Sequence, residues 1–151
     1  MKKFIVTDLR LATRLYKCGL LKYFNNTELV FHITGPCFNN RLYAYSNDKE
    51  IAKKMVQEGL MVVSNLDSNQ MQKVQELFEK YKPKFLAKTI TSLVYAEQIN
   101  YQLITEDECL KETAHELNIR AYNKEWLVTS LVSDITLMGG AIDLNMIMEI
   151  I

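Results

Sequence analysis

Residues 4–8 read Phe-Ile-Val-Thr-Asp, and residues 102–107 read Gln-Leu-Ile-Thr-Glu-Asp. In both stretches a short apolar run ends in a threonine, and one or two carboxylates follow it. Near-continuous apolar runs of this length are typical of parallel strands that are covered on both faces. Each stretch therefore predicts a buried strand with acidic residues directly after it.

Three further runs have the same character and predict three more strands. They lie at residues 29–33, 60–63 and, more weakly, 119–122. Helical patterns fill the segments between these runs. Strands that alternate with helices favour βαβ units, in which helices cover both faces of one sheet. The sequence therefore predicts an α/β fold, a three-layer α/β/α sandwich with a mainly parallel central sheet.

The helix starts are expected where capping residues precede apolar periodicity. One helix is expected to open at Thr7 or Asp8 and to carry apolar residues as far as Leu21. Capping-box spacing predicts three more helices, at Asn47-x-x-Glu50, Asp67-x-x-Gln70 and Thr105-x-x-Glu108. Further helices are expected over residues 89–99, 126–132 and 144–150, and residues 39–48 are expected to form an irregular loop or a pair of short helices.

Length and composition indicate a single domain over residues 1–151. The formal net charge is zero, so no global field draws the protein toward nucleic acid or membrane surfaces. The three cysteines form no CxxC pair, and their odd number favours free thiols in a reducing, cytoplasmic environment. No stretch approaches the roughly 20 apolar residues that span a bilayer, so no membrane association is expected.

The acidic residues after the first and fourth strands are the main candidates for chemistry. In open α/β sheets, ligands bind at the carboxyl ends of the strands, near the point where the strand order reverses. Asp8, Glu106 and Asp107 are therefore expected to converge there. Carboxylates that are forced together attract a hard cation such as Mg²⁺ or Mn²⁺, which can activate water or hold a phosphodiester. The alternative is structural, because acidic residues at helix starts are favoured by the helix dipole.

A locally basic segment follows Asp8. Arg10 and Arg14 recur at helical spacing and could contact the phosphates of a nucleic acid. The alternative is an ordinary solvated helix face. The chain has only two histidines and no glycine-rich phosphate loop, which argues against a Ser/His/Asp site and a nucleotide-binding loop.

Taken in order, these motifs resemble the PIN-like domain family over roughly residues 3–135. The run Phe4 to Asp8, with Cys18-Gly19-Leu20-Leu21 after it, is similar to the family's opening strand, aspartate and "GLL" helix. The segment from Leu93 to Asp107 resembles the family's helix and "LLTDD" strand. Leu110 to Ile119 and the following helix, with Trp126, also fit the pattern.

The resemblance implies metal-dependent cleavage of RNA with Mg²⁺ or Mn²⁺ as cofactor. Many members are toxins of toxin–antitoxin pairs and many form dimers, so it also implies an antitoxin-like protein partner and a homodimer. Asp8 matches the family's first acid, and Glu106 or Asp107 matches the acid after the fourth strand. The other two acids are expected near Asn40 and Thr89, which carry no charge, so the acidic cluster is incomplete.

Three functions follow from these residues. In the first, the protein is a metal-dependent endoribonuclease, in which Asp8 and Asp107 bind the metal and Glu106 assists catalysis. The residues expected to contact substrate or position water are Arg10, Arg14, Asn40, Thr89 and Thr105. In the second, the protein is a PIN-like module that has lost catalysis and binds protein or nucleic acid. The third is a small-molecule or phosphotransfer α/β domain, for which no nucleotide loop or phosphoacceptor pattern is present.

Overall fold

The computed structural model describes residues 2–25 and 27–151. In it, five strands form one sheet in the order β3-β2-β1-β4-β5, and every neighbouring pair is parallel. The strands are β1 (Lys2–Val6), β2 (Leu29–Thr34), β3 (Met61–Ser64), β4 (Gln102–Ile104) and β5 (Ala121–Tyr122). Each overlaps one of the five apolar runs, and β1 begins two residues before its run, at Lys2. The expected parallel sheet is confirmed.

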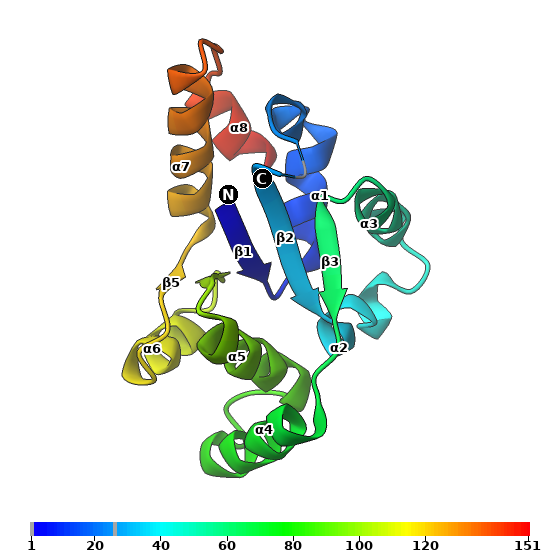
Figure 1. The fold of residues 1–151 in the computed structure, drawn as a ribbon, viewed down its shortest axis with the longest axis vertical. Coiled ribbons are helices and arrows are strands. Elements are labelled where there is room, and N and C mark those ends of the chain that lie inside the picture. Colours follow the sequence, from blue (N-terminus) through cyan, green and yellow to red (C-terminus); the bar gives the residue numbers. More distant parts are fainter. Residues whose placement is uncertain (1, 26) are drawn as a thin grey trace.

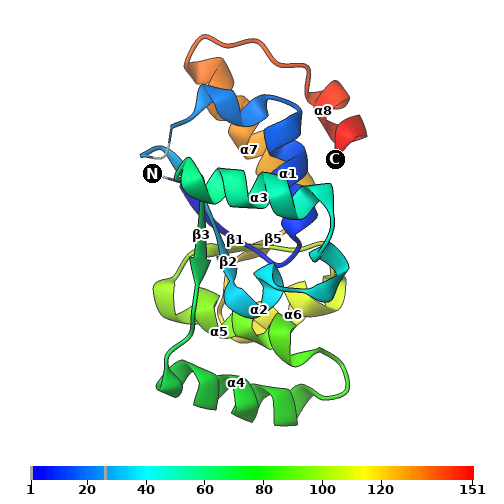
Figure 2. The ribbon, with the colours of Figure 1, turned by 90° about the vertical axis from the view of Figure 1, so that its right-hand side faces the viewer.

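Helices cover both faces of this sheet, which makes the three layers seen edge-on in Figure 2. One layer holds α1, α3, α7 and α8, and the other holds α5 and α6, with α4 packed on the outer side of α5 (Figure 1). The helices are α1 (Leu9–Lys17), η1 (Leu20–Tyr23), α2 (Gly35–Phe38), η2 (Arg41–Tyr43), α3 (Asn47–Gln57), α4 (Ser68–Tyr81), α5 (Ala87–Ile99), α6 (Glu108–Glu116), α7 (Lys124–Leu137) and α8 (Leu144–Ile150).

Alternating residues of the central strand β1 enter two separate apolar clusters. Phe4 and Val6 lie in the cluster beneath α1, α3, α7 and α8, whereas Ile5 lies in the cluster beneath α4, α5 and α6. All three side chains are buried. Because successive side chains of a strand point to opposite faces, a run of apolar residues is what a strand needs when both faces are covered.

Several helix starts differ from the sequence-based expectations. The cap of α3 is Ser46, whose hydroxyl accepts a hydrogen bond from the Lys49 N–H, rather than Asn47. The cap of α6 is Asp107 rather than Thr105. The expected box at Asp67 and Gln70 is confirmed, with both reciprocal hydrogen bonds present.

Three other segments also depart from the expectations. The first helix ends at Lys17, and Gly19, in the left-handed conformation at φ 80°, separates it from η1, where Leu20 lies. Of the two short helices considered for residues 39–48, one is present, η2. α5 and α7 both begin two residues earlier than expected, and α7 continues to Leu137.

The strand order positions a crevice at one end of the sheet. From β1, the chain runs to β2 and β3 on one side and later to β4 and β5 on the other. Val6 of β1 pairs with Ile104 of β4, so the residues that follow these two strands emerge side by side. Among the residues that the structure describes, no helix is both long and apolar enough to cross a membrane.

Candidate functional site

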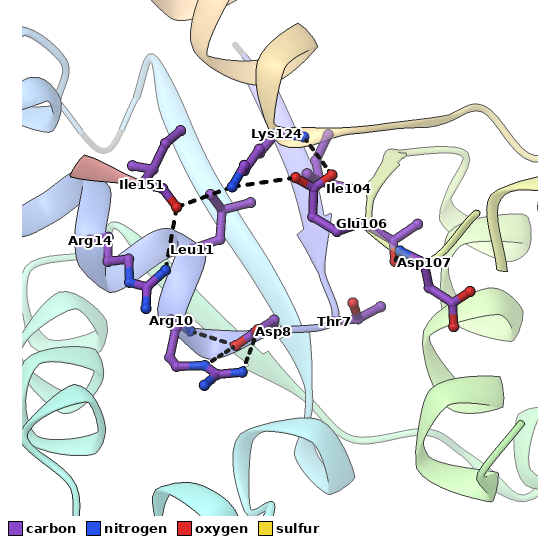
Figure 3. A pocket seen from close by; sticks show the side chains of 11 residues that line it. Thr7, Asp8, Arg10, Leu11, Arg14, Ile104, Glu106, Asp107, Lys124 and Ile151 are labelled. Carbon is purple, nitrogen blue, oxygen red and sulfur yellow. Dashed lines mark hydrogen bonds and ion pairs between the residues drawn. The ribbon is translucent and has the colours of Figure 1, made fainter. Parts of the chain in front are cut away.

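A cavity of about 370 Å³ lies at the switch point between β1 and β4. Figure 3 shows the residues that line it, which come from the ends of both strands, from α1, from the start of α7 and from the end of the α8 segment. Six sequence-predicted residues are among them: Asp8, Arg10, Arg14, Thr105, Glu106 and Asp107. Open α/β sheets bind ligands at this position, so the cavity is the first candidate for a functional site.

The carboxylate of Asp8, which lines this cavity, accepts hydrogen bonds from Arg10 and Tyr43. It caps α1 by accepting a hydrogen bond of 2.9 Å from the Arg10 N–H. The Arg10 guanidinium then reaches both carboxylate oxygens, Nε to Oδ1 at 3.2 Å and Nη2 to Oδ2 at 3.1 Å. The Tyr43 hydroxyl donates to Oδ1 at 2.7 Å. Four hydrogen bonds therefore converge on a single side chain.

These contacts set the ionisation of Asp8 and Tyr43. Burial by itself would raise the pKa of Asp8, but the hydrogen bonds from Arg10 and Tyr43 outweigh it and hold that pKa below its usual value. Burial and the bond to Asp8 raise the pKa of Tyr43. At neutral pH the pair therefore consists of a charged carboxylate and a neutral phenol that donates to it.

The two acids after β4 have separate partners. Glu106 lies 3.7 Å from the Lys124 ammonium and also accepts a hydrogen bond of 3.3 Å from the Lys124 N–H. Asp107 caps α6 by accepting from the Leu110 N–H at 3.2 Å. In Figure 3 Glu106 points toward Lys124, while Asp107 extends away from Asp8. The three acids thus line one cavity and face different groups.

Two basic side chains of the cavity, Arg14 and Lys124, also have a hydrogen-bond partner. The main-chain oxygen of Ile151 accepts hydrogen bonds from Arg14 at 3.3 Å and from Lys124 at 3.2 Å. Ile151 itself is buried, and Ile147 of α8 is buried in the same apolar cluster. The segment that contains α8 therefore brings an acceptor oxygen to two of the three cations in the cavity.

Asn40 and Thr89 lie outside this cavity lining. Asn40 caps η2, where its side chain accepts from the Leu42 N–H at 3.1 Å. Thr89 lies in the first turn of α5, and its N–H donates to the Leu86 oxygen at 3.0 Å. Both residues lie at the start of a helix, and the roles expected for them at the site stay predictions.

Sequence reasoning missed Tyr43 and Lys124. Tyr43 comes from η2, 35 positions after Asp8, and nothing in its local sequence distinguishes it from the tyrosines of the core. Lys124 begins α7 directly after Asn123, the residue that caps this helix. That cap could have placed Lys124 beside the end of β5, and so near the acids that follow β4.

The donor set present does not fit a divalent cation. Mg²⁺ and Mn²⁺ in such sites need carboxylate oxygens that are free to coordinate them. Both oxygens of Asp8 already accept hydrogen bonds, and Glu106 is paired with Lys124. In the described parts of the chain, no three His, Cys, Asp or Glu side chains come close enough to share an ion.

Comparison with known proteins finds similarity among solved structures. No family model matches this chain, and no curated protein matches it. Among solved structures, it is similar to a PilT N-terminus (PIN) domain protein from the hyperthermophilic archaeon Sulfolobus solfataricus P2. The match covers 87% of this chain and 94% of that chain, at 19% identity and a TM-score of 0.48. That protein is described as a PIN-domain protein, which is also the family that the sequence motifs resemble.

Proposed function

We propose that this protein is a PIN-like module that acts by binding a partner and not by metal-dependent hydrolysis. The observation that carries the proposal is the state of Asp8. Its carboxylate lines the crevice. Both of its oxygens nevertheless accept hydrogen bonds from Arg10 or Tyr43. A guanidinium in this position supplies the positive charge that a cation would otherwise provide.

The surroundings of Asp8 support the same conclusion. The family positions at Asn40 and Thr89 carry no charge, so neither can compensate a cation or act as a general base. The remaining acids, Glu106 and Asp107, serve an ion pair and a helix cap. The crevice keeps its shape and polarity while each of its acids has a structural role.

The charge pattern favours a polypeptide partner over a nucleic-acid backbone. Binding to nucleic acid depends on cations that are available to phosphates. Here Arg10 is paired with Asp8, and Arg14 and Lys124 bond to the Ile151 oxygen. The net charge of zero adds no long-range attraction.

Two measurements test the proposal. Mn²⁺ is titrated by calorimetry into the wild type and into Asp8→Asn, and both proteins are assayed with a mixed RNA substrate. We expect no saturable Mn²⁺ binding and no difference between the two proteins in RNA cleavage. Saturable binding that Asp8→Asn abolishes, together with cleavage that is lost in the same variant, would refute the proposal.

A metal-dependent endoribonuclease is the second candidate. One observation favours it: Asp8, Glu106 and Asp107 do line one cavity at the switch point of the sheet. For this function, a substrate or cation would have to displace Arg10 from Asp8. The RNA assay distinguishes the candidates, because cleavage by a nuclease would depend on both Asp8 and Asp107.

A further inference from the structure

The segment of residues 141–151, which contains α8, reaches the crevice between β1 and β4. Figure 3 shows Ile151 among the residues that line this cavity, with its main-chain oxygen directed at Arg14 and Lys124. Arg14 donates a hydrogen bond to this oxygen at 3.3 Å, and Lys124 donates to the same atom at 3.2 Å. Two cations therefore share one acceptor, and that acceptor belongs to the chain itself.

Arg14 depends on this contact more than Lys124 does. Lys124 also lies 3.7 Å from the Glu106 carboxylate. Arg14 forms no ion pair with any residue that the structure describes, and there its side chain donates only to the Ile151 oxygen. A guanidinium without a carboxylate partner is available to any acceptor that replaces this oxygen.

Apart from the Ile151 oxygen, the segment makes no hydrogen bond with the rest of the described chain. Its other hydrogen bonds join residues within the segment, such as those from the Asn145 and Met146 N–H groups to Asp143, which caps α8. Asp143 and Glu149 form no ion pair with any residue in the described ranges. The polar contacts that hold the segment in place are therefore the two at Ile151.

The apolar contacts of α8 come mainly from one face. Ile147 and Ile151 are buried in the cluster beneath α1 and α7, whereas the side chains of Met146 and Ile150 are 56% and 48% exposed. Three further apolar residues pack partly against the same cluster: Ile142, Leu144 and Met148. Residues four apart lie on one face of a helix, so α8 buries one apolar face and leaves another apolar face in solvent.

The connection between α7 and α8 allows the segment to leave without unfolding α7. The Gly140 N–H donates to the Ile135 oxygen at 2.9 Å, which fixes the turn after α7. Residues 141–143 form no regular structure, and Ala141 and Asp143 are exposed. Segments with few buried contacts and an exposed connection open locally before the core does.

We propose that residues 141–151 form a displaceable internal occupant of the crevice, which has to leave before a partner can use Arg14 and Lys124. This inference rests on the proposed function, because it describes how partner binding at that crevice is regulated. When the segment leaves, both cations lose the acceptor that they share. A partner then replaces it with an acceptor oxygen of its own and with aliphatic side chains spaced as Ile147 and Ile151 are.

A synthetic peptide with the sequence of residues 141–151 stands for the partner, and its amidated end keeps the last oxygen that of a peptide group. It is titrated by calorimetry into the full chain carrying Ile147→Ser, which weakens docking of the chain's own segment. We expect saturable binding, at least about tenfold tighter than to the wild type, because the wild-type segment competes from within the same molecule. Adding Arg14→Gln to Ile147→Ser should weaken peptide binding about fivefold or more, because a charge-assisted hydrogen bond is lost.

Two matched controls separate these contacts from general effects of substitution. Ile150→Ser changes the same residue type on the exposed face of α8 and should leave peptide binding as in the wild type. Arg120→Gln, added to Ile147→Ser, removes a guanidinium that donates to another main-chain oxygen, that of Asn100, at 3.0 Å. It should leave peptide binding at the level of Ile147→Ser alone.

Hydrogen exchange of the wild type gives a second measurement, which decides the matter even if Ile147→Ser folds poorly. The Ile147 and Ile151 N–H groups donate to the Asp143 and Ile147 oxygens within the segment. We expect them to exchange at least about tenfold faster than the core amides of α7, through a local opening of the segment.

Three results would each overturn the inference. The first is peptide binding that is equal in Ile147→Ser and Ile150→Ser, or absent from a folded Ile147→Ser chain up to about 1 mM. The second is an equal loss of peptide binding from Arg14→Gln and Arg120→Gln. The third is exchange of the α8 amides at the rate of the α7 core, through global unfolding alone. The proposed function fails separately, because it depends on Mn²⁺ binding and RNA cleavage by the wild type and not on the state of α8.

Discussion

Asp8 combines two local contacts with Arg10 and one long-range contact with Tyr43. Its main contact with α1 is local, through the Arg10 N–H, and the Arg10 side chain folds back onto the same carboxylate. The Tyr43 hydroxyl comes from a distant segment and joins α1 to η2. Because all of these groups are donors, they stabilise the charged carboxylate and occupy the directions from which a cation would approach.

The first prediction concerns the release of Asp8. The double variant Arg10→Ala/Tyr43→Phe removes three of the four hydrogen bonds to the carboxylate and leaves only the cap. We expect it to bind Mn²⁺ saturably, which the wild type does not, because the oxygens no longer accept bonds from the guanidinium and the phenol. Calorimetry measures this, with Arg41→Ala as the control. If the double variant also failed to bind Mn²⁺, the hydrogen bonds from Arg10 and Tyr43 would not be what keeps a cation from Asp8.

The second prediction concerns pH and the stability that Asp8 contributes. The pKa of Asp8 in the folded protein lies below the ordinary value of 3.8. Its contribution to the free energy of unfolding is therefore fully present above that value and is lost as the pH falls through the folded pKa. Because the side chain is 46% exposed, we expect the contribution to be below about 1 kcal/mol.

Denaturation curves of the wild type and Asp8→Asn between pH 7 and pH 2 measure this contribution. Asparagine caps a helix about as well as aspartate, so the variant keeps the cap and loses the charge. The stability difference between the two proteins should be constant near neutrality and should shrink in acid. A difference that grew in acid would mean that the folded pKa is raised.

At the scale of elements, the start of α6 shows where local sequence is ambiguous. Thr105 and Asp107 can both cap a helix, and Thr105 also has a glutamate three positions later. The structure uses Asp107, while the Thr105 hydroxyl accepts from the Asp107 N–H at 3.1 Å and fixes the turn before the helix. The acid that the family resemblance assigns to a metal site therefore has a structural role at this helix start.

The third prediction tests that role. Asp107→Ala should lower the free energy of unfolding by about 0.5–2 kcal/mol, the usual cost of losing an N-cap. Glu108→Ala is the control, because it removes only an exposed pair with Lys111, and it should change stability by less than about 0.5 kcal/mol. Urea denaturation of both variants makes the comparison. An equal loss of stability in the two variants would instead support the capping box expected between Thr105 and Glu108.

The limits of sequence-based prediction follow from the same elements. The strands were predictable because burial on both faces demands unbroken apolar runs such as Phe4 to Val6. The crevice was predictable because it follows from the adjacency of β1 and β4. The contacts of Asp8 with Tyr43 and of Glu106 with Lys124 were not predictable from the sequence. They form only through tertiary packing.

At the scale of the whole molecule, the sheet separates two apolar clusters that share its strands. Leu93 of α5 is fully buried in one cluster and Leu131 of α7 in the other. Since Phe4 and Ile5 are neighbours in β1 and enter opposite clusters, neither cluster can lose its packing without disturbing the central strand. This coupling is what the expected single domain over residues 1–151 requires.

The fourth prediction tests the coupling with the only tryptophan of the chain. Trp126 packs against the cluster of Leu131, with its ring stacked on Tyr122 at 3.9 Å, and so reports on one face. Leu93→Ala creates a cavity on the other face and should cost about 2–5 kcal/mol. If the molecule unfolds as one unit, tryptophan fluorescence and far-UV circular dichroism will shift to the same lower midpoint. An unchanged fluorescence midpoint would mean that the two faces unfold independently, because a cavity under α5 could then leave the packing of α7 intact.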